Sequence, residues 1–525
     1  MIVSCIRLAA AAMLLSLCTT ASIAQQRGGT LKVVLFPEPP ALVSLATPSV
    51  YAGVVSTKIH EGLVTYDFAM NPKPALAESW STSADGKTVT FKLRRGVTWH
   101  DGQPFTAADV KFSLEQVWKV LHPRGRTTYA NVTSVETPDD FTVVVKFSAP
   151  APALMASLSA AESQVLPKHI YEGTEFTKNP KFTAPIGTGP FMFKEYKRGD
   201  YISLVRNPNY WDKGKPYLDG ITVLIVPDAG ARAALFETGE ADIGYFNPVA
   251  LVDVDRLKKL PDLAVETKGY NYFAPVFLQE INLRDPYLKD VRVRKAIMHA
   301  LDRKFIVNNI WFGYGKEATG PISSAVARYY SPDVPKYPFD VALANKILDD
   351  AGYARGANGM RFKITHVNTV FSESARTADY FKQALARVGI DVELKSYDVG
   401  GFIREVYTNY NFGMTNNFMF CLPDPSVGVQ RLYTTANIKA GVPFANAPGY
   451  SNPVVDKDME TAQTENDPAK RAALYADFQR RVQNDLPALV LFEMDYVTLY
   501  NKRVFNHTMG AEAPFASFAD VYIKK

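Results

Sequence analysis

The stretch PALAESWSTSADGKTVTFKLRRGVTWHDGQPFTAADV, residues 74–110, carries the most specific pattern in the chain. Apolar and polar residues alternate over residues 89–93, which predicts a half-buried strand after a turn at residues 85–86. A helix is expected over residues 106–121, and a second alternating run at residues 141–147 predicts another strand. This succession of strands and a helix favours an α+β layer in the first part of the chain.

The composition is typical of a globular protein with a large core. The chain has 525 residues, 47% of them hydrophobic, and this length fits about three domains of ordinary size. The 58 basic and 53 acidic residues give a net charge of +5, and no long basic run is present that would follow the phosphates of nucleic acid. We therefore expect no nucleic-acid partner.

The first 24 residues have the pattern of a secretory signal peptide. Arg7 precedes an apolar run over residues 8–17, and the small side chains of Ser22 and Ala24 suit a peptidase that cuts before Gln25. That run is too short to span a bilayer, which needs about 20 residues. Export would place the protein in the bacterial periplasm with one of its three cysteines, so no internal disulfide is expected.

The second part of the chain alternates helical and extended patterns. Helices are predicted over residues 291–301, 340–351, 372–388 and 467–487, and strands over residues 390–394 and 488–492. Such an alternation favours a doubly wound α/β domain.

Motifs of several enzyme classes are absent. The chain has no Gly-x-Ser-x-Gly run and no Walker lysine motif. The segment HEGLV at residues 60–64 has Val64 where a zinc protease needs its second histidine, and the segment at residues 186–191 lacks the third glycine of a dinucleotide loop. The seven histidines include no i, i+4 pair. We expect no metal, no cofactor and no enzyme activity, although a secreted hydrolase stays open because catalytic side chains can meet in the fold alone.

Several strings together indicate one protein family. Besides residues 74–110 they are IGTGPF at 186–191, RNPNYW at 206–211, GKPYLD at 214–219 and VRVRKA at 291–296. The chain resembles the bacterial solute-binding proteins of ABC importers, of the large dipeptide, oligopeptide and nickel-binding type. The resemblance extends over nearly the whole chain beyond the signal peptide. Most of these strings also have a structural interpretation, as core aromatics and turns.

The resemblance implies an α/β fold of the periplasmic binding protein-like type II, with two lobes, a hinge and an extra α+β subdomain inserted in the first lobe. The expected boundaries are residues 25–280 and 490–525 for lobe I, about 65–184 for the inserted subdomain, and 281–489 for lobe II, with crossings near 278–283 and 489–494. The protein would act as a monomer in the periplasm, with the permease and ATPase subunits of an importer as partners.

The resemblance also places the ligand in the crevice between the lobes. Peptide binders of this type carry an aromatic residue and then an Asp for the ligand amine, ahead of an Asp-Pro pair. Here Asp424 matches that pair, Phe418 matches the aromatic residue and Cys421 stands in place of the amine-binding Asp. Because a neutral thiol does not pair with an ammonium group, the departure argues against a free peptide. Restoring Asp at position 421 is expected to increase affinity for free-amine peptides.

Further candidates come from a loop that carries an Arg for the ligand carboxylate in the dipeptide type. No Arg is present at residues 365–370, and Asn368 is the nearest match. His366 and Phe371, on either side of it, are also predicted to contact the ligand.

The nickel-chelate type presents an Arg and an aromatic residue after its first long helix, where this chain has Arg124, Arg126 and Tyr129. Arg126 is expected to hold an anionic group, and replacing it with Ala to weaken binding by about tenfold or more. Tyr51 and Asn417 complete the set of predicted ligand-binding residues.

The sequence therefore predicts a periplasmic protein that captures a small organic solute by lobe closure and does not alter it. A peptide-like solute is the first choice. A sugar conjugate, an opine-like compound or a metal chelate is the alternative because of Cys421. A sensor ectodomain and a secreted hydrolase are the other classes considered.

Overall fold

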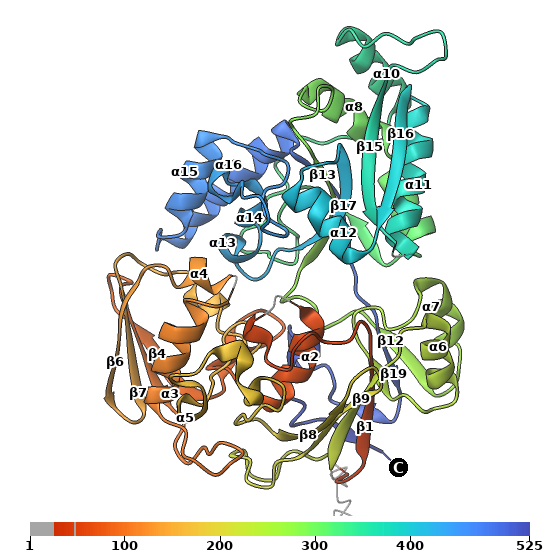
Figure 1. Cartoon of the computed structure of the whole chain (residues 1–525). Coiled ribbons are helices and arrows are strands. Elements are labelled where there is room, and N and C mark those ends of the chain that lie inside the picture. The colour runs from red at the N-terminus through yellow and green to blue at the C-terminus, as the bar shows by residue number, and fades with distance from the viewer. Residues whose placement is uncertain (1–25, 47–48, 123, 371, 525) are drawn as a thin grey trace, which may run out of the picture.

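Two large β-sheets, one in each of two lobes, organise the chain (Figure 1). The structure is a computed structural model that describes residues 26–524 except residues 47–48, 123 and 371. The predicted signal peptide lies outside this range. Within it, no helix is both long enough and apolar enough to cross a membrane.

Lobe I is built on a seven-stranded sheet in the order β12-β19-β11-β1-β10-β9-β8. Its strands are β1 (Thr30–Leu35), β8 (Phe191–Lys197), β9 (Tyr201–Arg206), β10 (Gly220–Ile225), β11 (Ile243–Gly244), β12 (Leu263–Glu266) and β19 (Thr498–Asn501). β1 pairs in parallel with β10 and β11, and the other pairs are antiparallel. The remaining elements of this lobe are η1 (Ser44–Ala46), α2 (Val50–Ile59), α6 (Ala229–Glu237), α7 (Leu251–Leu257), η9 (Ala513–Phe515) and the small pair β20 (Val504–Phe505) and β21 (Tyr522–Ile523).

A subdomain inserted between β1 and β8 contains a four-stranded antiparallel sheet in the order β4-β5-β7-β6. Its elements are β2 (Val64–Tyr66), β3 (Pro72–Pro74), β4 (Ala77–Thr82), β5 (Thr88–Leu93), α3 (Ala107–Phe112), η2 (Ser113–Trp118), α4 (Gly125–Thr128), β6 (Val132–Asp139), β7 (Thr142–Phe147), η3 (Leu154–Ala156), α5 (Lys168–Tyr171), η4 (Phe176–Lys178) and η5 (Pro180–Phe182). β5 and β7 confirm the two predicted strands. The helix predicted at 106–121 is divided, because its hydrogen bonds widen to π-helical spacing at Ser113, whose Oγ donates to the Asp109 carbonyl at 2.7 Å.

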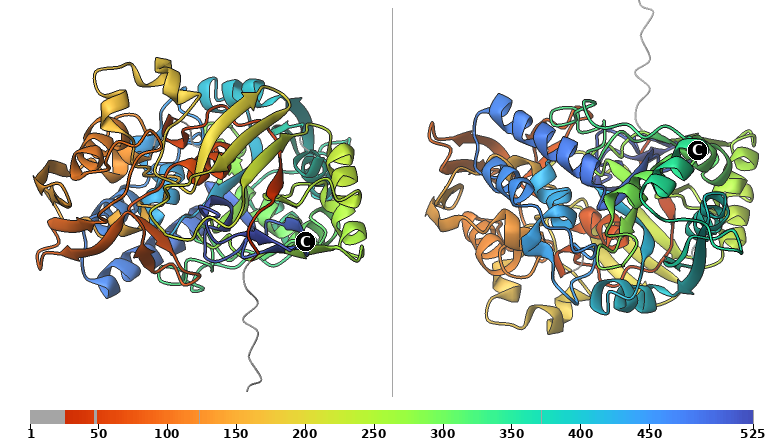
Figure 2. Two further views of the ribbon diagram at one scale, coloured as in Figure 1. Left: turned by 90° about the horizontal axis from the view of Figure 1, so that it is seen from below. Right: turned by 90° about the horizontal axis from the view of Figure 1, so that it is seen from above.

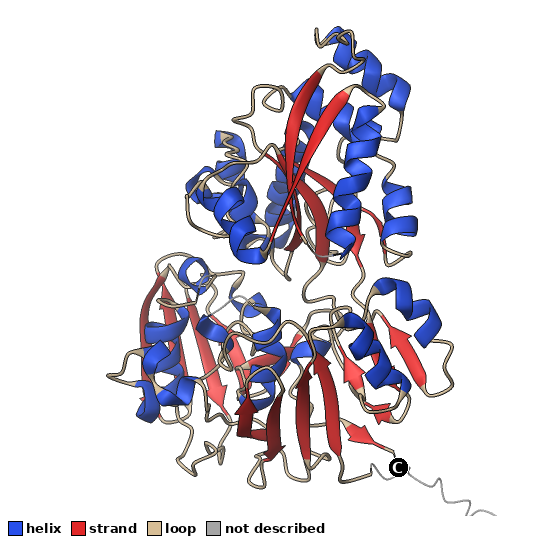
Figure 3. Cartoon of the chain, turned by 45° about the vertical axis from the view of Figure 1, so that its right-hand side comes forward, coloured by secondary structure: helices blue, strands red, loops and turns tan. Residues whose placement is uncertain are grey.

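Lobe II is built on a six-stranded sheet in the order β14-β18-β13-β17-β15-β16, with helices on both faces (Figure 3). Its strands are β13 (Pro275–Ile281), β14 (Gly315–Glu317), β15 (Phe362–Thr369), β16 (Ile390–Tyr397), β17 (Met414–Phe420) and β18 (Ala488–Met494). Its helices are α8 (Val291–Ala300), α9 (Arg303–Phe305), η6 (Ile306–Ile310), α10 (Val341–Asp350), α11 (Ser372–Ala386), α12 (Val399–Ile403), η7 (Arg404–Thr408), α13 (Pro425–Gly428), α14 (Gln430–Tyr433), η8 (Thr435–Asn437), α15 (Pro453–Ala462) and α16 (Pro468–Asp485).

The second sheet has helices on both faces, as a doubly wound domain does, and its strands run in mixed directions. β15 is parallel to β16 and β17, whereas β13 is antiparallel to both of its neighbours, β17 and β18. The predicted helices are confirmed as α8, α10, α11 and α16. Helix and strand patterns in a sequence do not specify strand direction, which explains the difference.

Residues 267–274 join β12 of the first sheet to β13 of the second, and residues 495–497 join β18 of the second sheet to β19 of the first. The crossings expected at 278–283 and 489–494 differ from these, because both stretches lie largely within β13 and β18, which hydrogen-bond to each other in the lobe II sheet. Every residue of these two strands is buried, so their sequences look alike whether they join lobes or fill a core. Views from below and above show the four-stranded subdomain at one end of the molecule and α6 and α7 at the other (Figure 2).

Candidate functional site: a pocket between the lobes

A small pocket is lined by residues of both lobes. Lobe I contributes Ser44, Ser49, Val50, Gly53, Arg124, Ala161, Glu162 and Phe515, and the residues from the first crossing and lobe II are Phe273, Phe420 and Leu422. A molecule in this pocket would therefore touch both halves of the protein at once. This is the arrangement required of a site whose occupation holds two lobes together.

Aromatic rings form one wall of the pocket. The ring centroid of Phe273 lies 4.8 Å from that of Phe515 and 5.4 Å from that of Phe420. Phe515 packs against α2 at Gly53, where an added Cβ would come within 2.6 Å of the ring. The glycine therefore allows α2 and η9 to approach closely, and this contact places Phe515 at the pocket.

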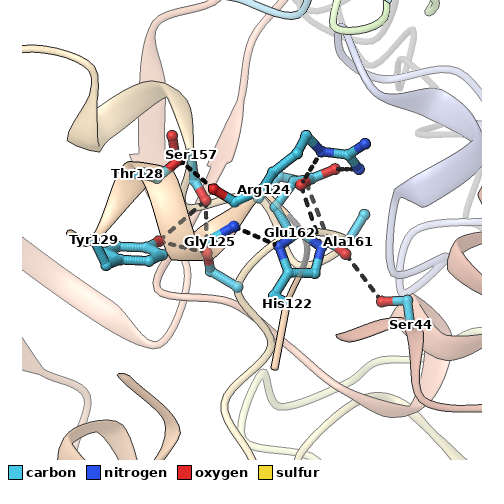
Figure 4. A network of polar contacts seen from close by, with 11 residues as sticks. Ser44, His122, Arg124, Gly125, Thr128, Tyr129, Ser157, Ala161 and Glu162 are labelled. Atoms are coloured by element: carbon cyan, nitrogen blue, oxygen red, sulfur yellow. Dashed lines mark hydrogen bonds and ion pairs between the residues drawn. The ribbon is translucent and has the colours of Figure 1, made fainter. Parts of the chain in front are cut away.

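The polar side of the pocket is an ion pair between Arg124 and Glu162 (Figure 4). The Arg124 guanidinium donates to both Glu162 oxygens, with Nε at 2.7 Å from Oε2. Burial opposes ionisation of Glu162, but the charge of Arg124 and the hydrogen bonds from its guanidinium outweigh burial and lower the pKa of Glu162. Arg124 is the N-cap residue directly before α4.

The His122 ring lies next to the Arg124–Glu162 ion pair. Its Nδ1 accepts from the Gly125 backbone N–H at 3.1 Å, so the proton of the neutral ring is on Nε2, which lies 3.5 Å from Glu162 Oε2. Burial lowers the pKa of His122 to about 4. The ring is therefore neutral at pH 7, and the Arg124–Glu162 pair has no net charge.

A second polar cluster lies in lobe II around Glu280 of β13. Tyr407 Oη donates to Glu280 Oε1 at 2.8 Å, and Asn417 Nδ2 donates both to that oxygen and to Tyr407 Oη. Burial raises the pKa of Glu280 to about 7 despite these hydrogen bonds. Next to this cluster, Arg431 of α14 donates through Nε to the Phe444 carbonyl at 2.6 Å.

The predicted residues of lobe I are not among those that line the pocket. Arg126 is exposed, donates to the Val120 carbonyl at 2.8 Å and borders a separate surface depression with Glu115 and Lys119. Tyr129 is buried, and its Oη lies 2.6 Å from Ser163 Oγ. Tyr51 on α2 is partly buried, and its ring centroid lies 6.4 Å from that of Phe246.

Cys421 and Asp424 are in the interior of lobe II. The Cys421 thiol lies 3.4 Å from the Ser323 backbone N–H and 3.5 Å from the Pro321 carbonyl, and burial raises its pKa to about 12. Asp424 caps α13 and forms a buried ion pair with Arg471. Neither is among the residues that line the pocket, and both are held by contacts within lobe II.

The other predicted residues of lobe II lie within the sheet or near the end of its strand β17. His366 Nε2 lies 2.9 Å from Gln279 Oε1, and Asn368 donates to Ser396 Oγ at 3.1 Å. Phe418 is 47% exposed, and its ring centroid is 5.5 Å from that of Phe420 in the pocket wall. Phe371 lies outside the described residues. Of the predicted residues, Asn417 thus contacts Glu280 in the lobe II cluster, and Phe418 packs near Phe420 in the pocket wall.

Sequence reasoning missed Glu162, Glu280 and Arg431. No motif marks them, because each belongs to the site only through contacts with distant parts of the chain. The sequence indicates the stretch that contains both Arg124 and Arg126. It does not indicate which of the two side chains faces the pocket, because that depends on the backbone at α4. Within the described residues, no group of three or more potential metal ligands is gathered.

Comparisons with known proteins agree with this arrangement. The family model of the bacterial extracellular solute-binding proteins, family 5, matches residues 71–440. The glutathione-binding protein GsiB of Pectobacterium atrosepticum is 28% identical over 477 residues, which cover 89% of this chain and 88% of the relative. A Brucella ovis protein named for peptide binding in an ABC transporter is 30% identical over 452 residues, or 81% of this chain and 80% of the relative.

One solved structure shows the same fold with a solute bound. The periplasmic binding protein AgaA of A. tumefaciens R10, in complex with agropinic acid, aligns with a TM-score of 0.78 and 26% identity. The alignment covers 95% of this chain and 99% of AgaA.

Proposed function

Because the chain belongs to the bacterial extracellular solute-binding proteins of family 5, we propose that it captures a peptide-like solute between its lobes and delivers it intact to an ABC importer. Binding a small solute for such an importer is the function of the family, so the importer's permease and ATPase subunits are the partners. The pocket lined by both lobes is the observation that supports this proposal most directly.

The proposal includes the state of the mature protein. The family is extracellular and its members serve importers, which supports a periplasmic location. We propose that residues 1–24 are removed as a signal peptide and that the remaining chain works as a monomer without catalysing a reaction. The small residues at Ser22 and Ala24 support the cleavage position.

A non-peptide solute is the second candidate. AgaA holds agropinic acid in the same fold, and among the described residues that line the pocket Glu162 is the one carboxylate. Because Arg124 already pairs with Glu162, the lining supplies no further carboxylate for an ammonium group. An acidic, opine-like compound would not need one.

Native mass spectrometry of freshly purified protein tests the proposal. We expect a mass increase that disappears on denaturation, followed by release of an unmodified peptide-like compound. Release of an acidic non-peptide compound would select the second candidate. A bound molecule that is converted to product during incubation would contradict the proposal and identify an enzyme.

Two neighbouring arginines provide a matched pair of variants. The double variant Arg124→Gln, Glu162→Gln removes the pocket ion pair without leaving a buried charge, and we expect it to weaken binding of the released compound by about tenfold or more. Arg126→Gln changes an arginine two residues away that faces the surface depression, and its affinity should equal that of the unaltered protein. An equal loss of affinity in the double variant and in Arg126→Gln would contradict the assignment of this pocket as the solute site.

A further inference from the structure

The hairpin turn between β4 and β5 touches lobe II at a distance from the two segments that join the lobes. Asn466, between α15 and α16, donates through Nδ2 to the Asp85 carbonyl at 3.4 Å. Figure 1 shows α15 and α16 above the four-stranded subdomain, and the joining segments to the right of both. The contact therefore lies where a rotation about the joining segments moves the lobes furthest relative to each other.

Hydrogen bonds within the turn fix its shape. The Ser83 hydroxyl donates to Asp85 Oδ1 at 2.6 Å, and the same oxygen accepts from the Lys87 backbone N–H at 3.0 Å. The Gly86 backbone N–H donates to the Ser83 carbonyl at 2.9 Å. The turn cannot retreat without losing these hydrogen bonds, so it presents a rigid surface to lobe II.

The backbone on the other side of the contact is also fixed. The Asp467 backbone N–H donates to Glu465 Oε1 at 2.8 Å. The Asp467 carboxylate caps α16, because it accepts from the backbone N–H groups of Ala469 and Lys470 at 2.8 and 3.1 Å. Asn466 is therefore attached to the first turn of α16 and moves with lobe II.

Gly86 leaves the room that the Asn466 side chain occupies. A Cβ added at Gly86 would lie 2.9 Å from Asn466 Cγ and nearer still to its Nδ2, which is closer than such atoms approach without a clash. The backbone φ of Gly86 is +68°, which also favours glycine. Gly96, beyond the other end of β5, has a similar φ of +74° but no atom within 4 Å of an added Cβ. Gly86 differs from Gly96 because it faces the other lobe.

We infer that the Asp85–Gly86 turn and Asn466 form a closure stop, which ends the approach of the lobes and so sets the width of the pocket between them. This inference rests on the proposed function, since it requires lobes that close on a solute. The long hydrogen bond contributes little, and the closure stop acts because atoms in contact cannot overlap. Contact far from the joining segments fixes the angle between the lobes, and with it the distance across the pocket from Arg124 to Phe420. Gly86 is thus a positioning residue that limits the size of the solute.

An engineered disulfide tests the closure stop without a solute. The variant Gly86→Cys, Asn466→Cys has its two Cβ atoms within the range that a disulfide spans, because a Cβ at Gly86 lies 2.9 Å from the atom next to the Asn466 Cβ. We expect diamide to cross-link this variant within one chain. Small-angle scattering should then give a smaller radius of gyration than that of the reduced, solute-free protein.

The variant Gly96→Cys, Asn466→Cys is the matched control and should not cross-link. Cys421 is buried and does not compete for the oxidant. Three results would overturn the closure stop: no cross-link in the first variant, an equal yield in the control, or a cross-linked protein whose radius is no smaller than that of the reduced form.

A bulkier turn tests the effect on solute size. Gly86→Asn adds a side chain between the lobes at little backbone cost, because Asn tolerates a positive φ. The lobes should then stay further apart, which disfavours a short peptide more than a long one. We expect the affinity ratio of trialanine to pentaalanine, measured by titration calorimetry, to fall about tenfold. Gly96→Asn should keep the ratio of the unaltered protein.

The double variant Gly86→Asn, Asn466→Ala moves an amide from one side of the contact to the other and should restore the ratio. An unchanged ratio in Gly86→Asn, an equal change in Gly96→Asn, or a ratio that the double variant does not restore would overturn the closure stop. The disulfide decides the matter where neither peptide binds.

The two proposals can fail separately. If the disulfide forms and lowers the radius while native mass spectrometry finds no bound compound, the closure stop is supported and the proposed function fails. If a compound is bound and released intact but the disulfide does not form, the function is supported and the closure stop fails.

Discussion

At the residue scale, Cys421 shows how a sequence position and its environment can suggest different roles. The sequence match places it where peptide-binding relatives carry an Asp for the ligand amine. In the structure its thiol is fully buried among the helices of lobe II, in contact with the Pro321 carbonyl and the Ser323 backbone N–H. The nearby Glu493 carboxylate contributes to the raised pKa of the thiol.

Replacing Cys421 with Asp is therefore expected to destabilise the fold rather than to create an amine site. The new carboxylate would be buried without a cation and would face the negative charge of Glu493, at a cost of about 3 kcal/mol or more. Guanidinium denaturation measures the change. Cys421→Ser is the control, since a hydroxyl of similar size can donate to the Pro321 carbonyl, and it should cost about 1 kcal/mol. Higher affinity for free-amine peptides at unchanged stability would restore the sequence-based interpretation.

His366 gives stability a defined dependence on pH. Burial lowers its pKa to about 4 in the folded state, whereas an unfolded histidine has a pKa of about 6.5. Between these values the unfolded chain binds the proton and the folded protein does not, so stability falls as the pH drops through this range. We expect the unaltered protein to lose about 2 kcal/mol more than His366→Gln between pH 7 and pH 4.5. Denaturation curves at both pH values test this, and equal losses would contradict it.

At the element scale, the IGTGPF string at residues 186–191 needs its glycines because its backbone packs closely against the end of α2. Gly189 donates its backbone N–H to the Ile59 carbonyl, the last residue of α2, at 2.8 Å. A Cβ at Gly187 would lie 1.8 Å from the same carbonyl oxygen. The string thus fixes the loop before β8 against the end of α2, the helix whose other end borders the pocket. Its glycines have a structural role and do not bind a nucleotide phosphate.

Gly187→Ala is expected to destabilise lobe I by about 2 kcal/mol or more, because backbone lies on both sides of the contact and neither can move aside as a side chain would. Thermal unfolding followed by circular dichroism measures the loss. Gly320→Ala is the matched control, since the nearest atom to its added Cβ is 4.0 Å away. Equal effects of the two substitutions would show that the close approach to α2 is not what requires the glycine.

The sequence predicts elements better than their arrangement, for physical reasons. Periodicity located β5, β7, α8, α10, α11 and α16, because each exposes one face and buries another. β13 and β18 are buried on both faces, so their sequences carry no alternation that would separate a lobe crossing from a central strand. The direction of β13 against β17 depends on contacts that are remote in the chain and leaves no local pattern.

At the scale of the whole molecule, the site exists only where distant segments meet. Arg124, Phe273, Phe420 and Phe515 line one pocket although hundreds of residues separate the first from the last. The sequence match indicates the family and a ligand site between the lobes. Which residues line that site depends on which side of each short helix faces the other lobe. For this reason the sequence indicates Arg126, whereas the structure places Arg124 in the lining.

The arrangement of the lobes leads to the last prediction. Two segments join them, and the second contains Tyr496, whose ring packs against Phe246 of lobe I at 5.0 Å and Phe420 of lobe II at 6.2 Å between centroids. Far from these segments, Asn466 of lobe II donates to the Asp85 carbonyl of the subdomain at 3.4 Å. The lobes thus touch on both sides of the pocket, as expected of a closed form that opens about the aromatic segment.

In solution, the solute-free protein should therefore have a larger radius of gyration than this arrangement gives, and saturating solute should reduce it to that value. Small-angle scattering over a range of protein concentrations measures both states and separates closure from association. Asn466→Ala removes one weak contact of the closed form and should change the solute-free radius little. A radius that is the same with and without tightly bound solute would show that binding does not proceed by lobe closure.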